Sequence, residues 1–388
     1  MKILHITLRG PVTDGWNYQD NMLIKYHKKL GHDVYMLTSK WIWGSDGKMH
    51  KTDKDRYDDK DGVHFVRIEI KGKDNFQNKF KRFENVYEEI ERISPDFIFA
   101  HAAQYLDIVE VGKYVRNNPN VRLVVDCHVD FSNSASNWIS KNILHRIIWG
   151  WHFRYIAKYA DHVYGVLPAR VEFLKNIYHV DPQKVSLLVM GADDELVEQA
   201  LLKDNIRSFR NKYEINETDF LIVSGGKIDK AKWQTLLLLE AVAKNKDEKL
   251  RLIIFGSVDE SIKDRFMQYI DGRRIQYVGW IDSADSYQFF GAADLVVFPG
   301  RHSVFWEEVA GMGKPMICKY WEGTTHVDKG GNVRFLYEDT LEAMQDAIEE
   351  CKEPEKYTYM CKLANENQYT FRYTEISKSC LPDYYDRG

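Results

Sequence analysis

A stretch in the C-terminal half of the chain, Phe298 to His326, carries residue types that could bind an anion. An apolar run ends there in a Pro-Gly turn, the polar loop Arg301-His302-Ser303 follows, and a helical pattern then carries Glu307 and Glu308. The first N–H groups of a helix have no partner within it, and the helix dipole is positive at that end, so we expect an anion near Ser303. A carboxylate one turn further along can bind hydroxyl groups of the same ligand. The simplest ligand with both features is a nucleotide.

A second loop of this kind lies between an apolar strand pattern, Phe220–Val223, and a helical pattern that begins at Trp233. Gly226 would let the backbone approach a pyrophosphate, and Lys227 and Lys232 would neutralise its charge. The spacing is not that of a P-loop. Solvated surface lysines explain the loop equally well.

Polar residues also follow apolar strand patterns in the N-terminal half. His101 ends one strand, and Asp126-Cys127-His128-Val129-Asp130 ends the next. In extended backbone Asp126, His128 and Asp130 share a face and Cys127 points away, which excludes a Cys–His dyad. A metal triad on that face would lack a fourth ligand. Gly15 follows the first strand, where it either brings the backbone close to a ligand or only permits a turn.

These residues depend on alternating strands and helices, a pattern that predicts parallel sheets with ligands at the carboxyl ends of the strands. The pattern runs through the first half, is interrupted by a polar stretch at 195–217, and restarts at Phe220. A chain of 388 residues is long enough for two domains. We therefore predict domains at 1–195 and 196–368, and a final helix at 369–388.

The composition limits the classes of function and the compartment. The net charge of −4 and the pI near 6.4 argue against non-specific nucleic-acid binding, which needs a basic face. Five scattered cysteines without a CxxC pair suit a reducing cytosol. The first strand pattern follows Met1-Lys2 directly, leaving no room for a signal peptide, and no apolar run approaches the ~18 residues of a membrane span. We expect a cytoplasmic protein, at most peripheral on the inner face of the cell membrane.

Two segments bear on membrane contact. The segment from Lys71 to Phe83 combines lysines with phenylalanines at helical spacing, which predicts a basic amphipathic helix that either lies on an anionic membrane or packs through its Phe stripe. The segment from Asn142 to Tyr159 reads as a long aromatic helix. We interpret this second helix as buried.

The order of these motifs resembles that of the retaining nucleotide-sugar glycosyltransferases of the GT-B fold, especially family four of bacterial surface polysaccharide synthesis. The loop from Gly226 through Lys232 is similar to the family's Gly-Arg…Lys loop, which holds the donor diphosphate. The segment from Glu308 to Pro315 is similar to the family's Glu-Ala-Met-Ala-x-Gly-x-Pro segment, whose glutamate binds ribose. The N-terminal hallmarks look like Gly15, His101, His128 and the segment Gly191-Ala192-Asp193.

The resemblance implies two Rossmann-like doubly wound parallel-sheet domains that face each other across a cleft, with a C-terminal helix crossing back to the N-terminal acceptor domain. It assigns catalytic roles to His128, Lys227 and Lys232, and an acceptor-side role to His101. The donor-binding residues that it implies are Gly15, Gly226, Arg301, His302, Ser303, Glu308, Thr324 and Thr325. Glu307 is left as a solvated neighbour. Counting eight positions back from Glu308, where the family has a second glutamate that contacts the sugar, gives Gly300.

The implied activity is transfer of a sugar from a nucleoside diphosphate to a hydroxyl of a glycan or lipid-linked acceptor. We expect a hexosyltransferase with retention of configuration, no metal requirement and no cofactor. Donor specificity would lie in the shortened loop from Gly300 to Ser303. Two alternatives stay open: a sugar-nucleotide 2-epimerase of the same fold, and a non-catalytic partner subunit.

Overall fold

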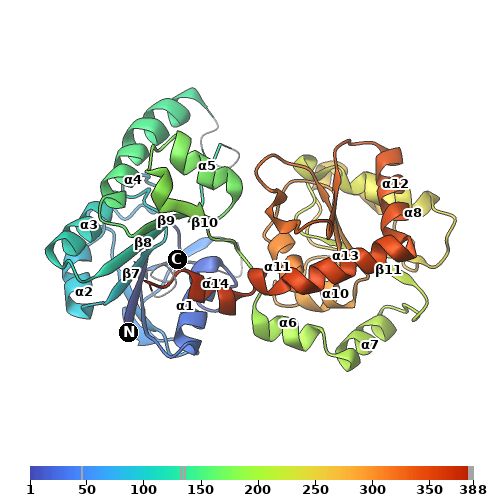
Figure 1. The fold of residues 1–388 in the computed structure, drawn as a ribbon, viewed down its shortest axis with the longest axis horizontal. Helices are drawn as coiled ribbons and strands as arrows, with labels where there is room; N and C mark the ends of the chain where they lie inside the picture. The colour runs from blue at the N-terminus through green and yellow to red at the C-terminus, as the bar shows by residue number, and fades with distance from the viewer. Residues whose placement is uncertain (45–46, 132–133, 135–136, 383–388) are drawn as a thin grey trace. The chain divides into compact units, whose positions relative to one another are not determined.

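The computed structural model describes residues 1–388 apart from 45–46, 132–133, 135–136 and 383–388. The chain divides into two compact units. Unit 1 comprises Met1–Val189 together with the residues from Ile376 onward, and unit 2 comprises Met190–Glu375. Each unit has its own sheet and its own hydrophobic core (Figure 1).

Unit 1 is built on an eight-stranded sheet of order β10-β9-β8-β7-β1-β2-β6-β5, with a separate hairpin β3-β4. The strands are β1 (Lys2–Thr7), β2 (Asp33–Ser39), β3 (Trp41–Trp43), β4 (Met49–Lys51), β5 (Arg56–Asp58), β6 (His64–Ile68), β7 (Phe97–Ala100), β8 (Arg122–Cys127), β9 (His162–Gly165) and β10 (Val185–Leu187). Only the β5–β6 pair of the large sheet is antiparallel. The inner strands are buried on both faces, as helix-covered parallel strands must be.

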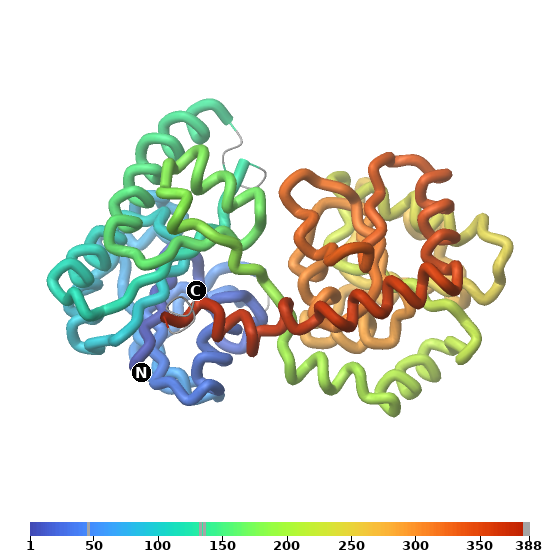
Figure 2. Tube along the Cα trace, viewed as in Figure 1, coloured from blue at the N-terminus to red at the C-terminus, as the bar shows by residue number. Residues whose placement is uncertain are grey.

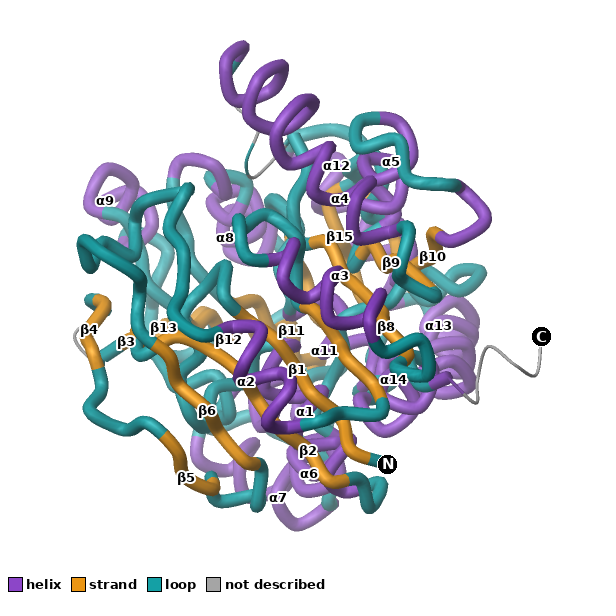
Figure 3. Tube along the Cα trace, turned by 90° about the vertical axis from the view of Figure 1, so that its left-hand side faces the viewer, coloured by secondary structure: helices purple, strands orange, loops and turns teal. Residues whose placement is uncertain are grey.

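The helices of unit 1 cover both faces of that sheet. They are α1 (Gln19–Lys29), α2 (Val86–Ile93), α3 (Ile108–Asn117), the π-helix η1 (Ser140–Trp149), α4 (Gly150–Ala157), α5 (Pro168–Asn176), the short 3₁₀ turn η2 (Pro182–Lys184) and the end of α14 (Tyr373–Ser379). Strand order proceeds in opposite directions from β1, so right-handed crossovers place α1 on one face and α2, α3 and α4 on the other (Figures 1 and 3). Figure 2 shows the C-terminal residues, in red, beside the first strand and helix, in blue.

Unit 2 has a fully parallel six-stranded sheet of order β13-β12-β11-β14-β15-β16. The strands are β11 (Phe220–Gly225), β12 (Leu250–Phe255), β13 (Ile275–Tyr277), β14 (Leu295–Phe298), β15 (Met316–Lys319) and β16 (Val333–Leu336). The helical segments are α6 (Asp194–Ala200), α7 (Lys203–Lys212), η3 (Lys230–Lys232), α8 (Thr235–Lys244), α9 (Glu260–Met267), α10 (Ser286–Ala292), α11 (Phe305–Gly311), η4 (Thr325–Val327), α12 (Leu341–Lys352), α13 (Pro354–Asn367) and η5 (Gln368–Phe371). The prediction of two α/β units with parallel sheets is confirmed.

The helix predicted from Lys71 to Phe83 is wrong. This segment contains bends and turns, and Ile70 and Phe83 form an isolated antiparallel bridge. The Asn75 and Asn78 side chains accept hydrogen bonds from the N–H groups of Gln77 and Phe80, at 3.1 and 2.9 Å. Such local turns compete with helix formation and win here over the helical spacing of the phenylalanines.

The aromatic helix exists as η1 followed by α4, but its interpretation as a buried helix is wrong. Large apolar side chains on these helices, and on the two residues before η1, are exposed to solvent: Trp138, Ile139, Ile143, Ile147 and Trp151. Trp149 of η1 and Phe153 of α4 are buried in the core of unit 1. We call the continuous helical segment from Trp138 to the end of α4 the η1–α4 rod. No helix among the described residues is long and apolar enough to cross a membrane.

Candidate functional site

The two loops predicted to bind a nucleotide meet at one edge of the sheet in unit 2. Strand β11 lies between β12 and β14, so the sheet changes its direction of winding beside β11. Doubly wound sheets bind ligands at this point, outside the carboxyl ends of the strands. The loop after β11 carries Gly226, Lys227 and Lys232, and the loop after β14 carries Arg301, His302 and Ser303.

Lys232 packs between these two loops. A Cβ added to Gly300 would lie 2.9 Å from Lys232 Cγ and 3.1 Å from Lys232 Cα. A Cβ added to Gly226 would lie 3.8 Å from Lys232 Nζ, and Gly226 itself has φ +112°. Glycine at position 300 therefore lets the lysine pass close to the backbone, whereas glycine at position 226 suits the left-handed backbone conformation there. Gly300, at the position of the missing family glutamate, makes room for Lys232.

The two lysines of the β11 loop differ in environment. Lys227 is 71% exposed, and its ammonium lies 3.5 Å from the Asp229 carboxylate. Burial lowers the pKa of Lys232, an effect that Asp229 partly offsets and Lys227 reinforces. No salt bridge of Lys232 occurs among the described residues. A bound anion would favour the charged form of this half-buried ammonium group and so oppose the effect of burial on its pKa.

Glu307 is fully buried, so its interpretation as a solvated neighbour is wrong. His302 Nε2 and His326 Nε2 each donate a hydrogen bond to Glu307 Oε1 at 2.8 Å. Burial raises the pKa of this carboxyl, but the two histidines outweigh burial and bring the pKa to about 2. Glu307 thus ties the loop after β14 to η4, the turn that contains His326. We call this set of three residues the His-Glu-His clasp.

Glu308 follows Glu307 in α11, but its pKa is shifted in the opposite direction. Its side chain is buried, and among the described residues its Oε2 has no hydrogen-bond partner. Burial, then the charges of Glu307 and Asp193, raise the pKa of Glu308 well above its ordinary value. Burial therefore favours the neutral form of Glu308, and vicinal hydroxyl groups of a ligand would satisfy its unused hydrogen-bonding capacity.

The start of the helix after β14 lies slightly later than the sequence predicts. Helix α11 spans Phe305–Gly311 with Val304 as its N-cap, and Ser303 comes before the cap. The Trp306 N–H donates to the Ser303 carbonyl at 2.9 Å, so Ser303 contributes an acceptor to the first turn. With seven residues, α11 is a short helix.

The remaining predicted donor residues of unit 2 lie in the β14 and β15 loops. The Thr324 hydroxyl and N–H both donate to the Trp321 carbonyl, at 2.9 and 3.2 Å. Thr325 begins η4. The Arg301 guanidinium lies 6.0 Å from the centre of the Trp321 ring, which places the two loops side by side.

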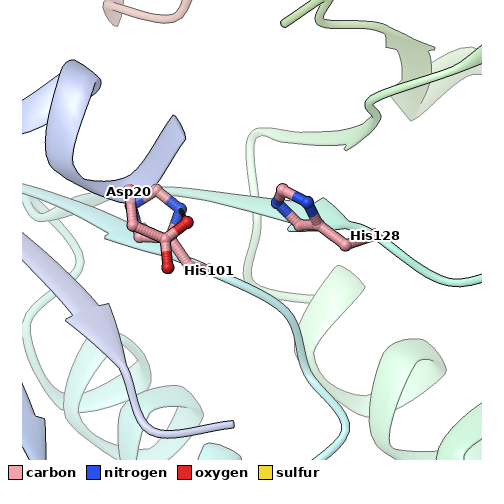
Figure 4. A group of neighbouring side chains, drawn as sticks. All are labelled: Asp20, His101 and His128. Atoms are coloured by element: carbon pink, nitrogen blue, oxygen red, sulfur yellow. Dashed lines mark ion pairs between the residues drawn. The ribbon is translucent and has the colours of Figure 1, made fainter. Parts of the chain in front are cut away.

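In unit 1, the predicted histidines lie at the carboxyl ends of β7 and β8. His101 Nδ1 lies 3.1 Å from Asp126 Oδ2 and 3.4 Å from Asp20 Oδ1, and His128 Nε2 lies 3.0 Å from the same Asp126 oxygen. Figure 4 shows Asp20, from α1, directly beside His101, with His128 at the end of the next strand. Asp130 does not join this group but pairs with Arg170 at 3.3 Å.

Gly15 lies apart from this group of histidines and aspartates, in the loop after β1. Its φ of +76° is in the left-handed region, and an added Cβ would meet no atom within 4 Å. Glycine is therefore required for the backbone conformation, and the space in front of it is open.

Among the described residues, two sets of three side chains bring ligand-type atoms within 4.8 Å of one another: Asp20, His101 and His128 in unit 1, and the His-Glu-His clasp in unit 2. The clasp atoms already form hydrogen bonds of 2.8 Å. His326 Nδ1 has no partner among the described residues. Metal-ligating histidines usually donate their other ring N–H to a second group, so the clasp fits a hydrogen-bonded brace better than a metal centre.

Sequence reasoning missed three histidines that contact these groups. His326 belongs to the clasp, and the rings of His5 and His27 form a hydrogen-bonded chain that leads to His101. His5 lies inside an otherwise apolar strand and His27 inside the apolar spacing of α1, and both are 0% exposed. A histidine at a position that the apolar pattern assigns to the core is the one sequence feature that could indicate a role for His5 and His27. Nothing in the spacing indicated that His326 pairs with a glutamate 19 residues earlier.

Both halves of the chain are similar to known protein families. Residues 21–196 match Glycosyltransferase Family 4, and residues 205–366 match Glycosyl transferases group 1. The two matches together cover most of both units. The chain belongs to the family-four-like glycosyltransferases.

Solved structures have the same fold as this chain. A glycosyltransferase from Rickettsia africae superposes with a TM-score of 0.67 at 15% identity, covering 99% of this chain and 98% of that one. HepE from Anabaena, in complex with UDP, gives 0.65 at 15% identity over 100% of both chains. UDP-GlcNAc 2-epimerase from Neisseria meningitidis, bound to UDP-GlcNAc, gives 0.63 at 11% over 100% of both. This glycosyltransferase therefore has the GT-B fold. A search of curated protein sequences finds no match.

Proposed function

We propose that this glycosyltransferase transfers a sugar from a nucleoside diphosphate to a hydroxyl of a glycan or lipid-linked acceptor, in the synthesis of a surface polysaccharide. The observation that carries the proposal is that Lys232 and Glu308 follow neighbouring strands, β11 and β14, at the winding reversal of unit 2. A half-buried cation without a salt bridge among the described residues suits a diphosphate. A buried carboxyl group whose Oε2 has no hydrogen-bond partner among the described residues suits a ribose. The complexes of HepE with UDP are consistent with such a donor.

The chemistry that we propose needs charge stabilisation more than a nucleophile. Cleavage of the sugar–phosphate bond leaves negative charge on the diphosphate, and Lys232 and Lys227 would stabilise that charge. We propose that no metal ion is needed, because these ammonium groups supply the positive charge. His128 would act on the donor sugar or on the leaving group, oriented by its hydrogen bond to Asp126. We name no side-chain nucleophile, and we propose retention of configuration with assistance from the donor phosphate.

A thermal-shift panel with UDP, GDP, ADP and CMP tests the nucleotide site. A ligand at a hundred times its dissociation constant raises the apparent stability by about 2.7 kcal/mol. We expect one nucleoside diphosphate to raise the melting temperature of the wild-type protein and to have a much smaller effect on Lys232→Ala. If none of the four nucleotides shifts melting, the proposed donor site is wrong.

The principal rival is a sugar-nucleotide 2-epimerase, because a UDP-GlcNAc 2-epimerase has the same fold over its whole length. Incubation with UDP-GlcNAc and no acceptor separates the two reactions. An epimerase would form the C2 epimer under these conditions. The proposed transferase would leave the sugar nucleotide unchanged and release UDP only when an acceptor is added. A protein that does neither with any donor, and whose Lys232→Ala variant leaves cellular polysaccharide unchanged, would be a non-catalytic partner subunit.

We propose that the protein contacts the inner face of the cell membrane through the η1–α4 rod of unit 1. Ile139, Ile143, Ile147 and Trp151 recur every four residues, which places them along one side, and they are 43–65% exposed. Trp138 extends this row and is 70% exposed. Residues 131–160 contain no Asp or Glu but carry Lys141, Arg146, Arg154 and Lys158. An apolar row within an acid-free, basic segment matches the interface of an anionic bilayer.

Sedimentation with lipid vesicles tests this surface. The wild-type protein should pellet with vesicles that contain phosphatidylglycerol and less with pure phosphatidylcholine. The double variant Ile139→Ser/Ile147→Ser should bind at least tenfold more weakly, because each large apolar side chain contributes roughly 1.5 kcal/mol or more on burial. Trp280→Ser is the matched control, since Trp280 is 71% exposed in unit 2. Equal binding by the double variant and the wild type would refute the proposal.

A further inference from the structure

A chain of hydrogen-bonded histidines runs through the interior of unit 1. His27 Nδ1 lies 2.9 Å from His5 Nε2, and His5 Nδ1 lies 2.9 Å from His101 Nε2. The three rings come from α1, β1 and the end of β7, and each is at most 2% exposed. Water therefore does not compete for these ring nitrogens. Each contact needs one proton between its two nitrogens.

The outer end of the chain fixes the direction of donation. His27 Nε2 lies 2.9 Å from the Ser377 carbonyl oxygen, which can only accept a hydrogen bond. The Cys380 thiol donates to the same carbonyl at 3.2 Å. His27 Nε2 must therefore carry a proton. In a neutral His27 ring, Nδ1 then accepts from His5 Nε2–H, and His5 Nδ1 accepts from His101 Nε2–H.

The inner end of the chain also terminates in an acceptor. His101 Nδ1 lies 3.1 Å from Asp126 Oδ2 and 3.4 Å from Asp20 Oδ1. An ionised carboxylate only accepts, so His101 Nδ1 must carry a proton as well. With an acceptor at both ends, three rings need four ring protons on their contacts, one more than three neutral imidazoles supply.

We infer that His101 is a constitutive imidazolium: the chain that begins at the Ser377 carbonyl requires one doubly protonated ring among the three, and His101 is the ring that lies within 3.4 Å of two carboxylates. Its positive charge lies between Asp126 and Asp20. It keeps Asp126 ionised, and Asp126 in turn holds the Nε2–H of His128. His101 is thus a positioning residue for His128 and does not act as a general base.

The electrostatic environment agrees with this distribution of protons. Burial, then His27 and His101, lower the pKa of His5 well below its ordinary value. Burial also lowers the pKa of His27, to about 3, against the effect of the Ser377 carbonyl. Burial opposes a charge on His101, yet Asp20 and Asp126 raise its pKa. The titratable groups around the chain are Asp20, His32, Asp126, His128 and Cys380.

Nuclear magnetic resonance of the protein labelled with ¹⁵N in histidine measures the ring protons directly. Replacing each ring in turn by Gln assigns its signals. Between about pH 6 and about pH 8, on either side of the ordinary histidine pKa, we expect His101 to show two protonated nitrogens. His5 and His27 should be neutral, each protonated at Nε2. Deprotonation of His101 within this range would overturn the inference. Protonation of His5 and His27 at Nδ1, which is the reversed direction of the chain, would do the same.

Two variants of His27 separate this proton count from a role in packing alone. In His27→Phe, His5 loses its acceptor and can donate from Nδ1 to His101, so His101 should become neutral and titrate. In His27→Gln, the amide N–H can donate to Ser377 and the amide oxygen can accept from His5, so His101 should stay doubly protonated. Identical protonation of His101 in the two variants would contradict the inference. The measurement does not depend on whether the protein transfers a sugar.

Discussion

At the scale of single residues, two neighbouring glutamates have contrasting environments. Glu307 accepts two hydrogen bonds and its pKa is lowered to about 2, whereas burial raises the pKa of Glu308 and leaves its Oε2 without a partner among the described residues. They are adjacent in α11, so helical geometry turns one toward the histidines and the other away. We therefore expect the same substitution, Glu to Gln, to change the stability of the protein by different amounts at the two positions.

We expect Glu307→Gln to destabilise the protein by about 2 kcal/mol or more, because it removes the buried charge that accepts hydrogen bonds from His302 and the buried His326. Glu308→Gln should change stability by less than about 0.5 kcal/mol, because it replaces one neutral group by another of similar shape. It should nevertheless weaken nucleotide binding. Urea unfolding of both variants checks the contrast. Equal destabilisation by the two substitutions would show that Glu308 is also ionised.

Sequence reasoning found Glu308 but misjudged Glu307, and the reason is physical. The position of Glu308 follows from the motif around it, which is local in the chain. The state of Glu307 depends on His326, which only the fold brings within 2.8 Å. The same holds for His5 and His27, whose importance depends on a carbonyl at Ser377.

At the scale of elements, loops that follow neighbouring strands bring the candidate site together. The sequence predicts these loops because parallel strands separated by helices place all their carboxyl ends at one edge. It does not predict that Gly300 lies against the stem of Lys232. The helical spacing of apolar residues also predicts a helix at 71–83, where hydrogen bonds of the Asn75 and Asn78 side chains form turns instead. In η1 the same spacing predicts a buried face, but the apolar side chains are exposed to solvent.

Gly300→Ala should displace Lys232, since the new Cβ would lie within 3.1 Å of both the backbone and the side chain of that lysine. We expect roughly tenfold weaker nucleotide binding and about 1–3 kcal/mol of lost stability. Calorimetric titration and thermal melting measure the two effects. Gly10→Ala is the control, because no atom lies within 4 Å of its added Cβ and its φ is not positive. Unchanged binding by Gly300→Ala would show that the position of Lys232 does not limit affinity.

At the scale of the whole molecule, the two units should respond differently to acid. In unit 1 burial lowers the pKa of His5, His152 and His162, of His27 to about 3, and of His145 to about 4. The unfolded chain therefore binds more protons than the folded one below the ordinary histidine pKa of about 6.5, and stability falls with pH from there downward. In unit 2 the depressed carboxyl pKa of Glu307 contributes stability that is lost only as pH falls from about 4.5 toward about 2.

We therefore expect unit 1 to lose stability before unit 2 as the pH is lowered from about 7 to about 5. The pKa of His101 is raised, so His101 favours the folded state as the pH falls. It is a single group, whereas the five histidines named above have the opposite effect. Hydrogen exchange, corrected for the intrinsic effect of pH, should show faster global opening in β1, β7 and β8 than in β11 and β14. Simultaneous weakening of both units over this range would contradict the assignment of neutral buried histidines to unit 1.

A nucleoside diphosphate should bind between Lys232 and Glu308. Calorimetric titration with the nucleotide that gives the largest thermal shift measures this binding directly. Loss of one charge-assisted hydrogen bond costs roughly 1.5–3 kcal/mol, so Lys232→Ala should weaken binding about tenfold to a hundredfold. Lys230→Ala removes an exposed lysine from the same loop and should bind as the wild type does. Equal affinities for Lys232→Ala and Lys230→Ala would contradict the account.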